Sequence, residues 1–159
     1  MRRRDREVVD KNEIIGILEK ADACRIAFSA DDIPYIVCMN YGFEWKGDFP
    51  VLYFHCAHEG KKIEMLKRNN YVCFQLDAAH ELHYIPEKVY CTMYYESIVG
   101  MGHLEIVSSE DERRKSLDLL MQRYNGEAPA AYPENSMMCT TILRLVTIEL
   151  TAKKNLRKT

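Results

Sequence analysis

The densest group of chemically capable side chains lies between residues 53 and 62, where the sequence reads Tyr-Phe-His-Cys-Ala-His-Glu-Gly-Lys-Lys. A strand-like run ends here, Gly60 follows, and Lys61 and Lys62 stand in the first turn of an expected helix. Free backbone N–H groups at a helix start, together with two ammonium groups, suit a phosphate monoester. The same residues also suit a charged turn that faces solvent, and their spacing alone leaves both interpretations open.

His55 precedes this turn on the expected strand. A strand histidine often has only a structural role, but next to a phosphate site it is a candidate to hydrogen-bond a ligand or to bind an anion as the imidazolium. The sequence contains no GxGxxG, no Walker-type GxxxxGK[ST], no HExxH and no GxSxG. A dehydrogenase or hydrolase site is therefore not predicted.

The six cysteines do not form a metal-binding or disulfide pattern. They are Cys24, Cys38, Cys56, Cys73, Cys91 and Cys139, and no two make a CxxC pair. Most lie in strand-like runs, so we expect small buried hydrophobic residues in a reducing compartment. No metal site is predicted.

The elements that must position these residues follow from the hydrophobic periodicity and the capping signals. Strands are expected at 24–28, 35–41, 51–56, 71–76, 94–107 and 139–150, and helices at 10–21, 60–68 and from 109 onward. Segments 42–50 and 128–135 are expected to be loops, and 77–89 is left unassigned. Six strands with only three helices favour one domain over 1–159, a mainly β fold with a six-stranded antiparallel split barrel and short flanking helices.

The expected strand at 35–41 is apolar on both faces. Tyr35, Val37 and Met39 share one face, and Ile36 and Cys38 share the other. A barrel strand with one face in water should alternate more cleanly between apolar and polar residues. We therefore expect a ligand or a partner subunit to cover the outer face, and we predict a homodimer.

Composition excludes several other classes of partner. The chain has 159 residues and a net charge of −2, so no general attraction to nucleic acid or to an anionic membrane is expected. No apolar stretch approaches the roughly 20 residues of a membrane span, and the N-terminus leads into no signal-peptide core. A cytoplasmic location is expected.

Three motifs in this order resemble those of a known family. They are Pro-Tyr-Ile-Val-x-x-Asn-Tyr at 34–41, Tyr-Phe-His-x-Ala-x-x-Gly-Lys-Lys at 53–62 and Ser-Ile-Val-Gly-x-Gly at 97–102. The sequence is similar to the nitroimidazole-resistance flavoproteins within the pyridoxamine 5′-phosphate oxidase-like, FMN-binding split-barrel group. The resemblance spans nearly the whole chain, and it implies a flavin, FMN or alternatively FAD, between two identical subunits.

The resemblance also implies which residues hold the flavin. The isoalloxazine ring is expected along the strand at 35–41, against backbone groups around Val37, Cys38, Met39 and Asn40. The phosphate is expected against His55, Lys61 and Lys62, with Arg25 as a weaker candidate, and Ser97 is expected to approach from the second subunit.

Two positions matter for the chemistry that the resemblance implies. His55 matches a position close to the reactive face of the flavin, so we expect it to position or protonate a substrate. Cys38 stands where a proline is usual in the family, and it restores a backbone N–H donor that proline lacks. This departure leaves the fold expectation intact but affects the expected contacts of the ring.

The expected function is an FMN-dependent oxidoreductase that reduces small nitroaromatic or quinone-type molecules with electrons from NADH or NADPH. Oxidation of pyridoxamine phosphate is less expected, because the sequence has no matching C-terminal arginine and tryptophan pair, and Trp45 is its only tryptophan. Two alternatives stay open. One is a flavin-binding or sensing protein without turnover, and the other is a haem-binding split barrel with His55 or His103 as axial ligand.

Overall fold

The fold is built on one antiparallel sheet of eight strands. The computed structural model describes residues 3–156. Along the chain the elements are η1 (Arg4–Arg6), β1 (Glu7–Val8), α1 (Lys11–Lys20), β2 (Cys24–Ala30), β3 (Ile33–Met39), β4 (Gly42–Lys46), β5 (Phe49–Cys56), α2 (Lys61–Arg68), β6 (Tyr71–Ile85), η2 (Pro86–Lys88), β7 (Tyr90–Ile106), α3 (Glu110–Asn125), α4 (Glu134–Met138) and β8 (Thr141–Asn155). The mainly β class with short helices is confirmed, with eight strands in the described chain instead of six. Within residues 3–156, no helix is both long and apolar enough to cross a membrane.

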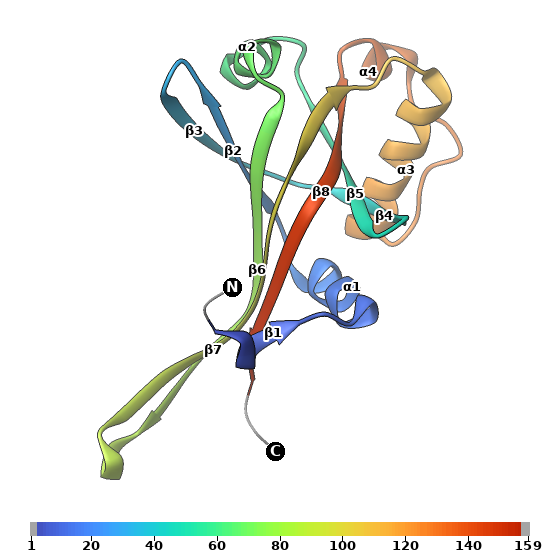
Figure 1. The fold of residues 1–159 in the computed structure, drawn as a ribbon. Helices are drawn as coiled ribbons and strands as arrows, with labels where there is room; N and C mark the ends of the chain where they lie inside the picture. The colour runs from blue at the N-terminus through green and yellow to red at the C-terminus, as the bar shows by residue number, and fades with distance from the viewer. Residues whose placement is uncertain (1–2, 157–159) are drawn as a thin grey trace.

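The strand order is β3-β2-β6-β7-β8-β5-β4, and β1 adds to the edge of β8 beside β5. The long strands β6, β7 and β8 form the centre, and the β2–β3 and β4–β5 hairpins diverge on either side of it (Figure 1). Helix α1 contacts β6 and β7, α2 contacts β2, and α3 contacts β4 and β5. The core between them is rich in aromatic and aliphatic side chains, including Phe28, Phe54 and Phe74.

The loop expected at 42–50 is a strand and a tight turn. β4 pairs with β5 from Gly42 opposite Tyr53 to Lys46 opposite Phe49, and Gly47 turns the chain with a φ of +61°. Phe43 and Trp45 alternate with Glu44 and Lys46, which is the period of a strand. The prediction of a loop was wrong because Gly42 begins a strand and Gly47 belongs to a hairpin turn, although glycines at this spacing are also typical of a loop.

The capping predictions differ in outcome. At the start of α1, the side chain of Asp10 accepts a hydrogen bond of 3.0 Å from the backbone N–H of Glu13, as expected. Helix α3 begins after Ser109, also as expected, but the Ser109 side chain makes no capping hydrogen bond. Ser109 and Glu112 therefore do not form the capping box that their spacing predicts, although the helix start is right.

The cysteines are mostly not buried. All six are free, but only Cys24 is buried; Cys56 and Cys73 are half-buried, and Cys38, Cys91 and Cys139 are exposed. The expectation of buried cysteines was wrong because Cys38 and Cys91 lie on strand faces that nothing within residues 3–156 covers, and Cys139 follows α4 outside any strand.

Glu44 on β4 links the β4–β5 hairpin to α3. Its carboxylate accepts a hydrogen bond of 2.6 Å from the Tyr53 hydroxyl and pairs with Lys46 at 2.8 Å and Lys115 at 2.5 Å. Partial burial alone would raise the pKa of Glu44, but these three partners outweigh it and lower the pKa to about 2.

Acid should therefore weaken the fold through Glu44. Because its folded pKa lies below the ordinary 4.5, Glu44 stabilises the fold above about pH 4.5, and this contribution is lost as the pH falls towards 2. We expect Glu44→Gln to lower the free energy of unfolding at pH 7 by about 2 kcal/mol and to flatten its dependence on pH below 4.5. Urea unfolding followed by circular dichroism checks this, with the exposed Glu127→Gln as control. A Glu44→Gln profile parallel to that of the wild type would contradict the assignment.

Candidate functional site

A surface cavity of about 490 Å³ lies where several strands end. It is formed by the end of β3, the end of β5 with the residue after it, the first turn of α2, and the two residues before β8. The lining residues are Val37, Cys38, Met39, Asn40, His55, Cys56, Ala57, Lys62, Cys139 and Thr140. We refer to it as the β3–β5 cavity.

Six of the nine residues predicted to contact a cofactor line this cavity: Val37, Cys38, Met39, Asn40, His55 and Lys62. They come from segments up to 25 positions apart in the sequence, so the fold brings them together. The cavity therefore combines an apolar strand, an imidazole and an ammonium group. Their role as cofactor ligands remains a prediction.

The other three predicted residues lie elsewhere. The Lys61 ammonium lies over the Tyr35 ring, 4.7 Å from its centroid, beside the cavity and outside its lining. Arg25 pairs with Asp77 at 2.6 Å and lines a different cavity. Ser97 lies on β7 opposite Asp77, away from the β3–β5 cavity of its own chain. The expected contact from Ser97 of a second subunit to the flavin stays a prediction.

Strand β3 is held at the edge of the sheet by a tight hairpin. Asp31 and Asp32 at its turn have φ values of 52° and 60°, the left-handed pair of a type I′ turn, and aspartate tolerates this conformation better than most residues. The pairing places Cys38 opposite Arg25 on β2. Within residues 3–156, β2 is the only strand that pairs with β3, so the outward backbone groups of β3 are available to a ligand.

The Cys139–Thr140 side of the cavity is fixed by two long-range contacts. The ring Nδ1 of His58 lies 2.6 Å from Thr141 Oγ1, and the Arg113 guanidinium donates a 2.9 Å hydrogen bond to the Thr140 carbonyl. Sequence reasoning missed this segment, because nothing local in residues 128–140 indicates that it closes a cavity.

The three histidines of interest have different surroundings. His58 contacts Thr141 through Nδ1, as described above, and the Met138 carbonyl through Nε2. His103 lies outside the cavity, its Nδ1 3.2 Å from Asn70 Oδ1 and its ring 5.4 Å from that of Tyr71. His55 is exposed and makes no side-chain hydrogen bond within the described part of the chain. It is the histidine free to contact a ligand in the cavity.

Three thiols line the same cavity: Cys38, Cys56 and Cys139. Partial burial raises the pKa of the Cys56 thiol, and the opposing effect of Lys62 is smaller. Cys56 is therefore a neutral thiol near pH 7. No group of three or more His, Cys, Asp or Glu side chains within residues 3–156 is arranged to hold a metal ion.

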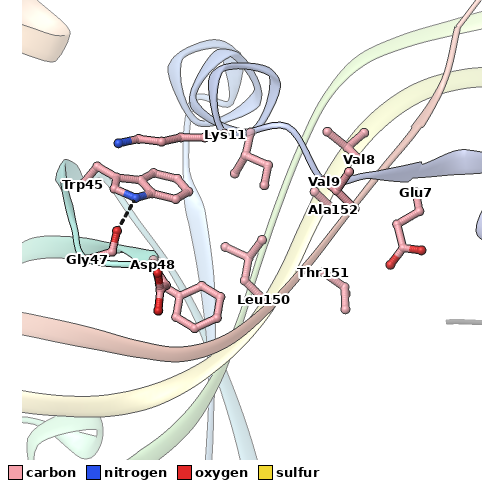
Figure 2. Close-up of a pocket in the computed structure, with 12 residues that line it drawn as sticks. Glu7, Val8, Val9, Lys11, Trp45, Gly47, Asp48, Leu150, Thr151 and Ala152 are labelled. Carbon is pink, nitrogen blue, oxygen red and sulfur yellow. Dashed lines mark hydrogen bonds between the residues drawn. The ribbon is translucent and has the colours of Figure 1, made fainter.

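A second cavity, of about 400 Å³, lies at the other end of β5 (Figure 2). The cavity lies beside β8, between the part of β8 that pairs with β5, which ends at Val146, and the part that pairs with β1, which begins at Ala152. Trp45 and Leu150 line it, and the Lys11 ammonium lies 5.0 Å from the Trp45 ring centroid. None of the predicted site residues lines this cavity.

A family model described as pyridoxamine 5′-phosphate oxidase matches residues 10–154. The chain belongs to the pyridoxamine 5′-phosphate oxidase family. A similar member of known structure is a candidate 5-nitroimidazole antibiotic resistance protein from Bacteroides thetaiotaomicron, with 32% sequence identity, coverage of 93% of this chain and 86% of that chain, and a TM-score of 0.80. The resemblance inferred from the three motifs is thereby confirmed.

More distant structures share the fold of this family. The flavocytochrome Anf3 from Azotobacter vinelandii is 15% identical, with a TM-score of 0.77 and coverage of 99% of this chain and 72% of that chain. The FAD and heme binding protein from Mycobacterium smegmatis is 18% identical, with a TM-score of 0.76 and coverage of 94% and 73%. Among curated proteins, none matches the sequence.

Proposed function

We propose that this protein binds FMN in the β3–β5 cavity of a homodimer and reduces small nitroaromatic or quinone-type molecules with electrons from NADH or NADPH. The observation that carries the proposal is the convergence of β3, His55 and Lys62 on one cavity. The flavocytochrome and the FAD and heme binding protein, which share the fold, support a flavin as the cofactor.

The residues present fit such a cofactor. Val37 and Met39 offer apolar surface to a flat ring, and the edge of β3 offers backbone donors and acceptors, including the Cys38 N–H. Lys62 supplies a positive charge for the phosphate. When bound, the flavin would supply the electron transfer between nicotinamide and acceptor. In this arrangement His55 holds or donates a proton at the substrate.

The homodimer is part of the proposal because the outer face of the sheet exposes large apolar side chains within residues 3–156. Ile36 is 66% exposed and Val99 44% exposed, and the register from β3 across β2 and β6 to β7 places both on the same face. Burying such side chains against a second copy is favourable. Dimerisation through this face would also bring Ser97 of the partner subunit towards the flavin. The six free thiols favour a reducing compartment, so a cytoplasmic location belongs to the proposal.

The first experiment identifies the chromophore. Protein purified in the dark is heated, the released molecule is identified by mass, and oxidation of NADH or NADPH with a nitroaromatic acceptor is then compared with an equal amount of free FMN. FMN together with turnover above that control supports the proposal. A Soret band would assign a haem, and bound flavin without turnover would leave a non-catalytic binder.

His55→Ala should leave the fold intact, because the side chain is exposed. We expect flavin affinity or turnover to fall by about 10- to 100-fold, the usual effect of losing one charged hydrogen bond or a proton donor. Flavin fluorescence titration and steady-state kinetics measure this, with His103→Ala outside the cavity as control. If His55→Ala matched the wild type in both measurements, His55 would not belong to the site.

A further inference from the structure

A two-stranded arm projects from the sheet (Figure 1). It consists of residues 81–94, from the ends of β6 and β7, with η2 at its tip. A register shift between Ala78 and Glu81 marks its base, and β8 ends there, with Asn155 opposite Tyr95. Beyond that point β6 and β7 pair only with each other among the described strands.

One face of the arm is apolar and uncovered. Leu82 lies opposite Met93, and Tyr84 lies opposite Cys91, so these four side chains share a face. Leu82 is 60% exposed, Tyr84 55% and Met93 46%, and Cys91 is also exposed. None of the four carries a charge at neutral pH. We refer to them as the arm face.

Such a ribbon needs a covering surface. An isolated two-stranded hairpin is at best marginally stable in water, and a contiguous exposed apolar patch marks an interaction site. The large residues of the arm face, Leu82, Tyr84 and Met93, present roughly 300 Å² of side-chain surface, at roughly 100 Å² for each.

The arm face and the outer face of the sheet lie on the same side of β7. Alternate residues of a strand lie on the same side, and β7 continues past the register shift that lies between Ala78 and Glu81 of β6, so Val99, Ser97 and Met93 share one side of β7. Ser97 and Tyr95 lie between Val99 and Met93 on this side, and the Arg25–Asp77 ion pair lies beside Ser97. The arm face is therefore a separate apolar patch on the same side of β7 as Val99.

We propose that the arm clasps a second copy of this chain, with the arm face packed on the partner subunit. This inference rests on the homodimer in the proposed function and adds the element that holds the two subunits together. In a two-fold dimer each subunit contributes the same patch, so the two arm faces and the partner surface that they cover bury on the order of 1,200 Å² before the sheet faces are counted. A stable interface buries about 1,200–2,000 Å² in total, which the arms and the sheet faces together reach.

The charges of the arm favour a protein surface over a membrane. Residues 81–94 contain Glu81 and Glu87 against a single Lys88. A segment that binds an anionic membrane needs an excess of cations. A second copy, which presents the same apolar arm face, is the complementary surface.

The test compares wild type with two arm variants, all saturated with FMN. Leu82→Lys/Tyr84→Lys places charges on the arm face, a second variant replaces residues 79–95 with an Asn-Gly turn, and Glu87→Lys at the exposed tip is the matched control. Masses are measured by analytical ultracentrifugation from 0.1 to 100 µM, and FMN affinity by fluorescence. We expect the wild type and the control to be dimers. For both arm variants we expect dimer dissociation constants at least on the order of 100-fold higher. Both arm variants should still melt cooperatively.

The outcomes separate the two proposals. A dimeric wild type with equally tight dimers in both arm variants would overturn the arm inference and leave the proposed flavin function untouched. A monomeric wild type that still binds FMN would overturn the arm inference and the dimer, but not flavin binding. A monomeric wild type that sediments with phosphatidylserine vesicles, while Leu82→Lys/Tyr84→Lys does not, would assign the arm to a membrane and overturn the inference.

Discussion

Replacing Lys62 by alanine should weaken FMN binding by about 10- to 100-fold and leave riboflavin binding nearly unchanged. Lys62 lines the β3–β5 cavity at the start of α2. A hydrogen bond from an ammonium group to a phosphate contributes about 1.5–3 kcal/mol, which corresponds to this loss. Riboflavin has the same ring without the phosphate, so the difference between the two ligands isolates the phosphate contact. Quenching of flavin fluorescence on titration with protein measures both affinities.

Lys61 provides the matched control. It is the neighbouring residue in the same helix turn, but its ammonium lies over the Tyr35 ring. We expect Lys61→Ala to weaken FMN binding less than Lys62→Ala does. Equal losses for FMN and riboflavin in Lys62→Ala would show that the phosphate binds elsewhere. A larger effect at Lys61 would show that its side chain leaves Tyr35 when the phosphate binds.

Replacing Gly102 by alanine should lower the free energy of unfolding by about 2–4 kcal/mol. A Cβ atom at this position would lie 2.3 Å from the backbone oxygen of Val146 on β8. Gly102 also sits at the register shift between β7 and β8. The clash is with backbone, so the strands must separate and lose ladder hydrogen bonds. In a protein of this size, each kcal/mol lowers the melting temperature by roughly 2–4 °C.

Gly16 in α1 is the control for this substitution. A Cβ atom there has no neighbour within 4 Å. Alanine is the better helix former, so we expect Gly16→Ala to stabilise the protein by about 0.5–1 kcal/mol. Thermal unfolding followed by circular dichroism compares both variants. A Gly102→Ala protein as stable as the wild type would mean that β8 moves away from β7 at little cost.

Local signals in the sequence located most of the elements. The helix after Asp10, the helix after Gly60 and the strand ending at Cys56 were predicted because each has its own cap, turn or periodicity. The arm could not be assigned, because its strands are apolar on a face that nothing in the same chain covers. Without one buried and one wet face, the alternation that identifies a strand is lost.

The candidate site was predictable only in part, and the reason is distance along the chain. The motifs at 34–41 and 53–62 indicated Val37 to Asn40, His55 and Lys62. They did not indicate Cys139 or Thr140, which reach the cavity through the pairing of β5 with β8. The sequence also did not indicate which of Lys61 and Lys62 lines the cavity. Adjacent helical residues point about 100° apart, and only the packed structure shows which one faces the cavity.

The pairing of Cys56 with Thr141 joins residues 85 positions apart and closes the β3–β5 cavity. Contacts of such long range are slow to form, because the loop between them must first lose its conformational entropy. During synthesis, a complete cavity therefore cannot exist until β8 has been made and has paired. A ligand held there then acts on the unfolding equilibrium of the whole domain, stabilising it by RT ln(1 + [L]/Kd), and the melting temperature should rise with ligand concentration.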